Sequence, residues 1–204
     1  MAKQTTSGRS AEISRQTKET RVRVVLNLDG SGKSAAETGV GFFNHMLDLL
    51  AKHSLIDMTV SAEGDLEVDP HHTVEDVGIV IGQALEKALG DKRGIHRYGW
   101  AMVPMDESLA QVAVDLSGRP AVVFKAPFSP GSIGTFPTEL VEEFFRGLAN
   151  SARMNLHVNV PYGSNNHHIA EAIFKATAKA LRQAVSIDPR ASGDVPSTKG
   201  SLNG

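Results

Sequence analysis

The sequence predicts an α+β protein built from two copies of one structural unit. The motif His-His-x-x-Glu occurs at His71 and again at His167, 96 residues apart in a chain of 204. Each copy opens an apolar run with helical spacing, and an Ala-Leu pair follows both copies at the same distance. Matching motifs at matching places indicate a tandem duplication. Each half reads as strands, helix, strand and helix, which predicts an antiparallel or mixed sheet with helices on one face.

In the first half, Val22, Val24 and Leu26 alternate with polar residues, which is typical of a half-buried strand over 22–28. The segment Gly32-Lys33-Ser34 resembles the end of a phosphate-binding loop, but that loop needs a glycine where Asn27 stands. We therefore predict a hairpin turn after the strand. The remaining expected elements are a helix at 42–53, a strand at 55–60 and a helix at 72–89.

In the second half, the segment 90–94 is rich in glycine and charge and forms the natural boundary between the halves. The expected elements after it are strands at 96–105 and 108–116, a Gly/Pro-rich loop at 127–137, a helix at 138–151, a strand at 154–160 and a helix at 168–186. The predicted organisation is a flexible tail at 1–9, half-domains at 10–92 and 93–190, and a C-terminal tail at 191–204.

Composition limits the possible functions. With 41% hydrophobic residues the chain can bury a real core. A formal charge of −2 without basic clusters argues against nucleic-acid or membrane-surface partners. The chain has no cysteine, and it shows neither a signal peptide nor a membrane-spanning run. We expect a soluble, cytoplasmic protein, although the removal of a transit peptide stays open.

The spacing of the repeated motif predicts metal ligands. On a helix, positions four apart share a face, so His71 lies beside Glu75 and His167 beside Glu171. The second histidine of each motif points about 100° away. Imidazole and carboxylate donors suit Mn, Fe, Zn and similar divalent ions. One motif alone would more often be polar residues at a helix start, but two copies favour a metal site.

A third candidate ligand appears in each half when the helix at 42–53 is laid over that at 140–151, because His45 then matches Glu143. We expect two ions, with donors that can come from different subunits. His53 and His157 have no counterparts and are interpreted as structural. The expected ligands are His45, His71, Glu75 and His168 for one ion, and Glu143, His167, Glu171 and His72 for the other.

An ordered set of motifs gives the chain a family resemblance from about residue 10 to residue 200. The motifs are Phe42-Phe43-Asn44-His45-Met46, Asp69-Pro70-His71-His72-Thr73-Val74-Glu75-Asp76, Pro104-Met105-Asp106-Glu107, Asp115-Leu116-Ser117-Gly118-Arg119-Pro120, His167-His168-Ile169-Ala170-Glu171-Ala172 and Pro196-Ser197-Thr198-Lys199-Gly200. Together they resemble the monofunctional imidazoleglycerol-phosphate dehydratases of histidine biosynthesis.

The resemblance implies a hydro-lyase with two Mn²⁺ per active site that converts imidazole glycerol phosphate to imidazole acetol phosphate. It also implies two half-domains, each a four-stranded sheet with two helices, and trimers that assemble into a 24-subunit homo-oligomer with active sites at subunit contacts. One position departs from the pattern, because many members carry histidine where this chain has Glu143. Glutamate also binds Mn²⁺, so we expect a retained site with altered charge.

The expected chemistry explains the ligands. A metal on the substrate imidazole stabilises its deprotonated form. The imidazolate expels the hydroxyl from the adjacent carbon to give a diazafulvene, and loss of a proton from the next carbon gives an enol that becomes the ketone. By family likeness Glu19 is the expected base on carbon, acting with the metal-binding histidines and glutamates. By the same likeness, the phosphate ligands are Arg97, Arg119, Ser197 and Lys199.

Two other functions remain possible from the sequence. A di-iron oxidase also uses Glu and His on helices, but it is expected in a four-helix bundle, and the strands at 22–28 and 108–116 count against it. A metal-storage or metal-assembled shell protein would need no phosphate ligands, so binding of a phosphate ester separates it from the enzyme.

Overall fold

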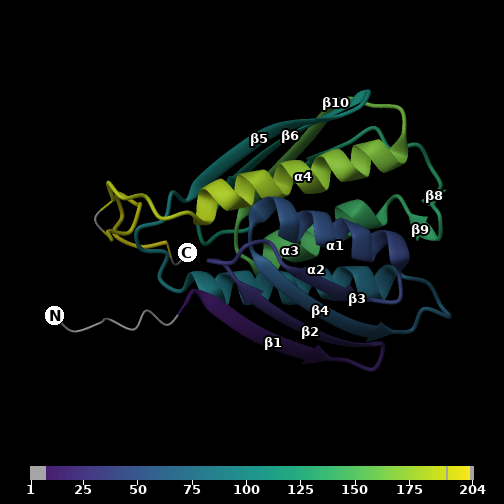
Figure 1. Cartoon of the computed structure of the whole chain (residues 1–204), viewed down its shortest axis with the longest axis horizontal. Helices are drawn as coiled ribbons and strands as arrows, with labels where there is room; N and C mark the ends of the chain where they lie inside the picture. Colours follow the sequence, from purple (N-terminus) through teal and green to yellow (C-terminus); the bar gives the residue numbers. More distant parts are fainter. Residues whose placement is uncertain (1–7, 192, 203–204) are drawn as a thin grey trace.

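A computed structural model of the chain describes residues 8–191 and 193–202. Two four-stranded sheets form the outer layers, and the helices lie between them (Figure 1). This arrangement confirms the predicted α+β fold of two similar halves with mixed sheets. Each sheet lies entirely on one side of the predicted boundary at residues 92 and 93, and the boundary itself stays a prediction.

The two sheets have the same strand order. The first runs β1 (Ser10–Gln16), β2 (Thr20–Asn27), β4 (Asp57–Gly64) and β3 (Ser34–Glu37), with only the β3–β4 pair parallel. The second runs β5 (Tyr98–Met105), β6 (Ser108–Asp115), β10 (Asn155–Tyr162) and β7 (Ala121–Lys125), with only the β7–β10 pair parallel. In the central strands, buried residues such as Val22 and Val24 alternate with exposed ones, as their patterns predicted.

The helices of the two halves pack against each other across the middle of the molecule. They are α1 (Gly41–Ser54), α2 (His71–Leu89), α3 (Leu140–Ser151) and α4 (Asn166–Val185). Helix α1 packs on α4, and α2 packs on α3. The α2–α3 contact is close because glycine lies there: a Cβ on Gly78 would stand 2.5 Å from the Phe144 carbonyl oxygen. Each first-half helix therefore packs on a helix of the second half.

The predicted hairpin after β2 is wrong, because β2 pairs with β4 while β3 crosses over to run parallel to β4. The Asp57 carboxylate accepts the backbone N–H groups of Ser31 (2.8 Å) and Lys33 (2.9 Å). A side chain of the protein thus occupies the backbone donors that resembled a phosphate-binding loop. The sequence interpretation also missed β1, β3 and β7, and the short strands β8 (Ser132–Ile133) and β9 (Phe136–Pro137) within the expected loop at 127–137.

Arg9, the last residue of the predicted N-terminal tail, makes specific contacts with the rest of the chain. Arg9 binds the Asp29 carboxylate and the Val185 carbonyl oxygen, which joins the first sheet to the end of α4. Residues 1–7 of that tail lie outside the described residues, as do residues 192, 203 and 204 of the C-terminal tail. Among the helices that the structure describes, none combines the length and apolarity that a membrane crossing requires.

Candidate metal centre and phosphate pocket

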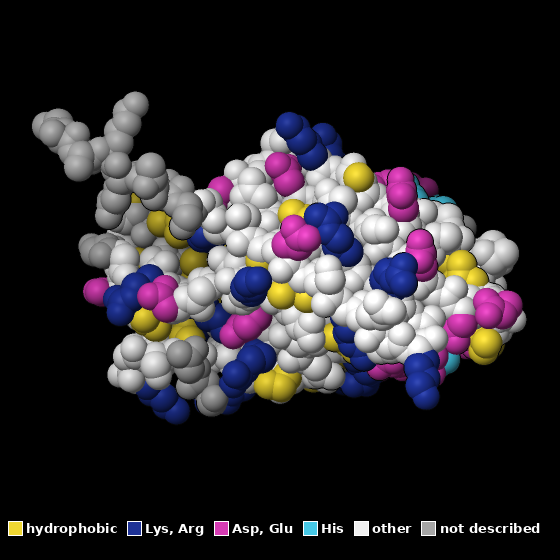
Figure 2. Space-filling view, turned by 90° about the horizontal axis from the view of Figure 1, so that it is seen from below, with side chains coloured by type: hydrophobic (Ala, Val, Ile, Leu, Met, Phe, Trp, Pro, Cys, Tyr) yellow, Lys and Arg dark blue, Asp and Glu magenta, His cyan; other side chains and the backbone are white. Residues whose placement is uncertain are grey.

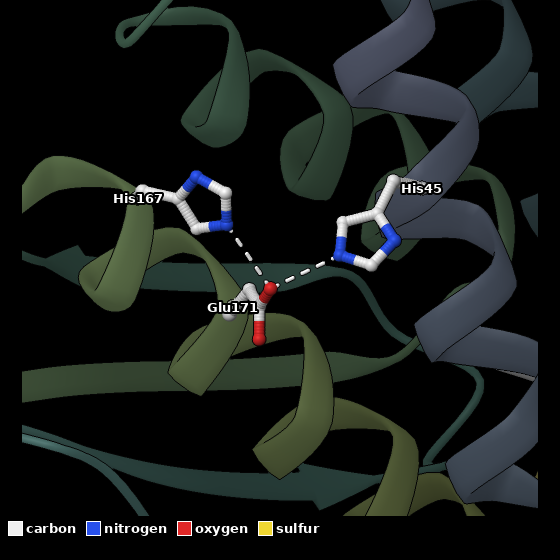
Figure 3. A group of neighbouring side chains, drawn as sticks. All are labelled: His45, His167 and Glu171. Atoms are coloured by element: carbon white, nitrogen blue, oxygen red, sulfur yellow. Dashed lines mark hydrogen bonds and ion pairs between the residues drawn. The ribbon is translucent and has the colours of Figure 1, made fainter.

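Two helices bring three candidate ligands together (Figure 3). His45 projects from α1, and His167 and Glu171 project from the first turns of α4. The Nε2 atoms of His45 and His167 lie 3.0 and 3.1 Å from the same Glu171 oxygen, Oε1. One ligand atom from each residue falls within 4.8 Å of the others, which is compact enough to surround one ion.

The candidate ligands that meet within one chain differ from the expected grouping, which allowed donors from different subunits. The sequence argument placed His45 with His71 and Glu75, which belong to its own half. Within one chain, His45 instead meets His167 and Glu171, because α1 packs on α4 and not along the start of α2. The i,i+4 facing of His167 and Glu171 is as expected. Whether these residues bind metal stays a prediction.

Glu171 is buried, and a lysine compensates its charge. Burial alone would raise the pKa of Glu171, but hydrogen bonds from Lys175, His45 and His167 outweigh burial and hold that pKa at about 2. The Lys175 Nζ atom lies 2.5 Å from Glu171 Oε2, which leaves Oε1 to face both histidines. The sequence interpretation missed Lys175, although its place four residues after Glu171 could have indicated the contact.

The corresponding residues of the other helix pair are more open. His71 Nε2 lies 4.0 Å from Glu75 Oε2, and both side chains are nearly half exposed. Glu143 lies in the first turn of α3, the helix that packs on α2. Among the described residues these three do not form a compact group like the one at Glu171. If they bind an ion, further donors must close the site.

The second histidine of each motif is held by a carboxylate that the sequence interpretation missed. His72 Nδ1 lies 3.0 Å from Asp65, and His168 Nδ1 lies 2.6 Å from Glu107. The hydrogen bonds to these carboxylates raise the pKa of both histidines. The bond to His168, with further bonds from backbone N–H groups, holds the pKa of Glu107 far below its ordinary value.

Glu19 is exposed in the turn between β1 and β2, and not within a strand. Its backbone N–H donates to Thr17 Oγ1 (3.1 Å), and its carbonyl oxygen accepts from the Asp65 N–H (3.1 Å). The turn and Asp65 line an open pocket of about 330 Å³. The backbone of Glu19 is therefore fixed while its carboxylate faces open space beside the loop that holds His72.

All four predicted phosphate ligands line one pocket of about 540 Å³. Arg97 binds both oxygens of Asp115 and donates to the Pro196 carbonyl oxygen (2.9 Å), so it also fastens the C-terminal tail. The hydrogen bonds that Arg97 donates to Asp115 raise the pKa of Arg97. The pocket is lined by Arg97, Tyr98, Ser117, Arg119, Pro196, Ser197, Thr198, Lys199, Ser201 and Leu202.

The pocket and the metal ligands lie at opposite ends of α4. The backbone N–H of Arg97 binds the carbonyl oxygen of Ala184, near the end of this helix, whereas His167 lies at its start. Seventeen residues of helix at 1.5 Å per residue separate the two by about 26 Å. One small substrate cannot touch both sites of the same chain.

Comparison with known proteins identifies the family. The family model described as imidazoleglycerol-phosphate dehydratase matches residues 38–181. The chain is 60% identical to the imidazoleglycerol-phosphate dehydratase of Azorhizobium caulinodans over 96% of this chain and 100% of that protein. It is 56% identical to that of a Polaromonas species, over 97% of this chain and 96% of that protein.

Solved structures agree with this match. The imidazoleglycerol-phosphate dehydratase of Staphylococcus aureus superposes with a TM-score of 0.80 at 44% identity, over 88% of this chain and 99% of that chain. The enzyme from Pyrococcus furiosus, in complex with (S)-C348, superposes with a TM-score of 0.79 at 35% identity, over 93% of this chain and 99% of that chain. The chain therefore belongs to the imidazoleglycerol-phosphate dehydratase family of hydro-lyases in histidine biosynthesis.

Proposed function

We propose that the chain removes water from imidazole glycerol phosphate to give imidazole acetol phosphate, with two Mn²⁺ per active site. The observation that carries the proposal is the cluster of His45, His167 and Glu171, in a chain whose relatives bear the name of this activity. The pocket that contains Arg119 and Lys199 suits the phosphate of such a substrate, because guanidinium and ammonium groups bind phosphate oxygens.

The donors of the cluster fit the proposed metal. Two imidazole nitrogens and a carboxylate oxygen within 4.8 Å are a suitable donor set for Mn²⁺. His45, His167 and Glu171 would hold one ion, and Glu143, His71 and Glu75 the other, with His72 and His168 adding donors at subunit contacts. When bound, such ions stabilise the deprotonated imidazole ring of the substrate.

The side chains of the protein then have separate tasks. Glu19 accepts the proton from the carbon beyond the one that loses hydroxide, since its carboxylate is exposed and its backbone is fixed on both sides. A positioned base of this kind contributes about 10²–10⁴-fold to a rate. Arg97, Arg119, Ser197 and Lys199 bind the phosphate and set the position of the reacting carbons.

The proposed site requires more than one subunit, because about 26 Å of helix separates His167 from the phosphate pocket in a single chain. The second sheet supplies a surface for association: Tyr98, Trp100 and Met102 are exposed on β5. The outer face of the first sheet carries mixed charges instead (Figure 2). Assembly into 24 subunits built from trimers, and a cytoplasmic location, are parts of this proposal.

The decisive test is a dehydratase assay on chelated protein with and without added Mn²⁺, which follows formation of imidazole acetol phosphate. We expect no turnover after chelation and full turnover on Mn²⁺ addition. A phosphate ester without the imidazole ring is the control and should bind without reacting. Uptake of metal without turnover of the imidazole substrate would favour the storage or shell alternative.

A further inference from the structure

The two histidines of each motif are held through different ring atoms. The first histidines, His71 and His167, turn Nε2 toward the glutamate four residues later. The second histidines, His72 and His168, are held at Nδ1 by Asp65 and Glu107. The two carboxylates come from different places, since Asp65 follows β4 and Glu107 lies between β5 and β6. A carboxylate therefore contacts Nδ1 of the second histidine in both halves, although the two carboxylates lie at positions that do not correspond in the two halves.

We propose that Asp65 and Glu107 are positioning residues that fix the tautomer of His72 and His168, so that each ring offers Nε2 to a metal ion. An ionised carboxylate only accepts hydrogen bonds, so each Nδ1 must carry the proton, and the lone pair then lies on Nε2. Ligating histidines are commonly held by a carboxylate in this way. The inference rests on the proposed function for the ligand role of these two histidines.

The Nε2 atoms of His72 and His168 make no hydrogen bond to any described residue. The nearest carboxylate to His168 Nε2 is Asp106 at 3.6 Å, beyond hydrogen-bonding distance, and the Asp106 side chain is largely exposed. The side chains of His72 and His168 are about one third and one quarter exposed. Both Nε2 atoms are therefore free to meet an ion from outside the chain.

The two carboxylates differ in their other contacts, and this difference provides a sharp test. Glu107 Oε1 accepts the backbone N–H groups of Ser164 and Asn165, while Oε2 faces His168. In Glu107→Gln, the amide oxygen must stay with the backbone donors, which leaves the NH₂ group against His168 Nδ1. The ring must then accept at Nδ1 and carry its proton on Nε2, where it cannot bind a metal.

Asp65→Asn should behave differently. The Asp65 carboxylate makes no side-chain hydrogen bond in the described residues besides those to His72 Nδ1. An asparagine amide can therefore turn its oxygen toward the ring and preserve the Nδ1–H tautomer. The two amide substitutions thus remove the same charge but leave opposite tautomers.

The experiment measures Mn²⁺ affinity by titrating chelated protein and counting free Mn²⁺ by electron paramagnetic resonance. We expect Glu107→Gln to weaken the binding of one Mn²⁺ ion by about 10–100-fold. The Mn²⁺ affinity of Asp65→Asn should stay within about threefold of the wild-type affinity. Glu107→Ala leaves the ring free to choose its tautomer, so it should bind Mn²⁺ better than Glu107→Gln although it damages the loop more. Wild-type affinity in Glu107→Gln, or equal losses in both amide variants, would overturn the inference.

His168→Ala separates this inference from the proposed function. If His168→Ala weakens Mn²⁺ binding and Glu107→Gln does not, the positioning role alone fails. If His168→Ala leaves Mn²⁺ affinity unchanged, the ligand assignment fails and the inference fails with it. Thermal unfolding of each metal-free variant shows whether a loss of affinity reflects a loss of fold.

Discussion

Glu19 and Glu107 occupy the same place in the two halves of the molecule but have different environments. Each is the last residue of a tight turn, Glu19 before β2 and Glu107 before β6. Glu107 is bound by His168 and by two backbone N–H groups. Glu19 makes no side-chain hydrogen bond among the described residues and faces an open pocket. Equivalent carboxylates are thus bound in one half and free in the other.

The difference teaches how a duplicated unit can divide its tasks. In the second half, Glu107 itself holds the second histidine of the motif. In the first half, Asp65 holds that histidine, and its backbone N–H also binds the Glu19 carbonyl oxygen. Because Asp65 holds the ring, the Glu19 carboxylate has no such partner among the described residues, as its proposed role in proton transfer requires.

The largest effect that tests this comparison concerns turnover. Glu19→Gln should lower kcat by about a hundred-fold or more, because it removes a proton acceptor and no metal ligand. Steady-state kinetics at saturating substrate, with metal content measured on the same samples, check the prediction. Glu107→Gln is the counterpart variant in the second half, and its primary loss should be of bound metal rather than of turnover. Near-normal turnover of Glu19→Gln with both ions in place would show that the base lies elsewhere.

A second effect compares the two glutamates of the motifs. Glu171 is buried and bound to Lys175, whereas Glu75 is nearly half exposed and is followed four residues later by Ile79. In metal-free buffer, Glu171→Ala should lower the free energy of unfolding by about 1–3 kcal/mol, because it leaves a partly buried ammonium group unpaired. Glu75→Ala should change the free energy of unfolding by no more than about 0.5 kcal/mol. Denaturant titration measures both, and equal losses would contradict the comparison.

Local patterns predicted the elements that bury one face. The central strand β2 and all the helices were predicted from apolar spacing, as in Val22, Val24 and Leu26. Strand β3 was missed because it is a short edge strand with no fully buried residue. Strand β1 has only Ala11 fully buried, so its alternation is weak. The hairpin error came from the same cause, since a crossover to a parallel edge strand leaves no local pattern.

The candidate site was predictable as a set of residues but not as a geometry. Spacing of four along a helix gave the His167–Glu171 pair directly. It could not place His45 there, because the α1–α4 contact joins residues more than a hundred positions apart in sequence. Asp65, Glu107 and Lys175 were missed for a related reason. Their roles follow from which hydrogen-bonding atom each turn or helix face presents, and this depends on the folded structure.

A third, smaller effect tests the proposed phosphate pocket, which the second half forms together with the C-terminal tail. Lys199→Ala should raise KM by about tenfold, the equivalent of one lost charge-assisted contact of about 1.4 kcal/mol. Lys33→Ala is the control, because this exposed lysine lies in the first half, outside the pocket. A fall in kcat as well would show that phosphate binding also positions the reacting carbons. An unchanged KM in steady-state assays would remove Lys199 from the substrate site.

The smallest effect concerns the first residues of β4 and β10, where the two halves differ in charge. Asp57 accepts backbone N–H groups of Ser31 and Lys33, and these hydrogen bonds lower its pKa below the ordinary 3.8. Asn155 instead donates to the Arg119 carbonyl oxygen (2.7 Å). A lowered pKa means that the folded state favours the ionised form, so Asp57 stabilises the protein above pH 3.8. That stabilisation is lost as the pH falls through the lower folded value.

An ionised carboxylate should therefore stabilise the protein at position 57 and destabilise it at position 155, so that both variants approach the wild type as the pH falls. Asp57→Asn should lower Tm at neutral pH and flatten the loss of Tm below pH 4, in metal-free buffer. Asn155→Asp should also lower Tm at neutral pH, because an ionised carboxylate would face the Arg119 carbonyl oxygen. Acid should relieve that repulsion, since the protonated carboxyl can donate, so the difference in Tm from the wild type should shrink as the pH falls. Thermal unfolding from pH 7 to pH 3 measures both variants. A difference in Tm from the wild type that stays constant from pH 7 to pH 3 in either variant would show that the carboxylate at that position does not sense the backbone groups beside it.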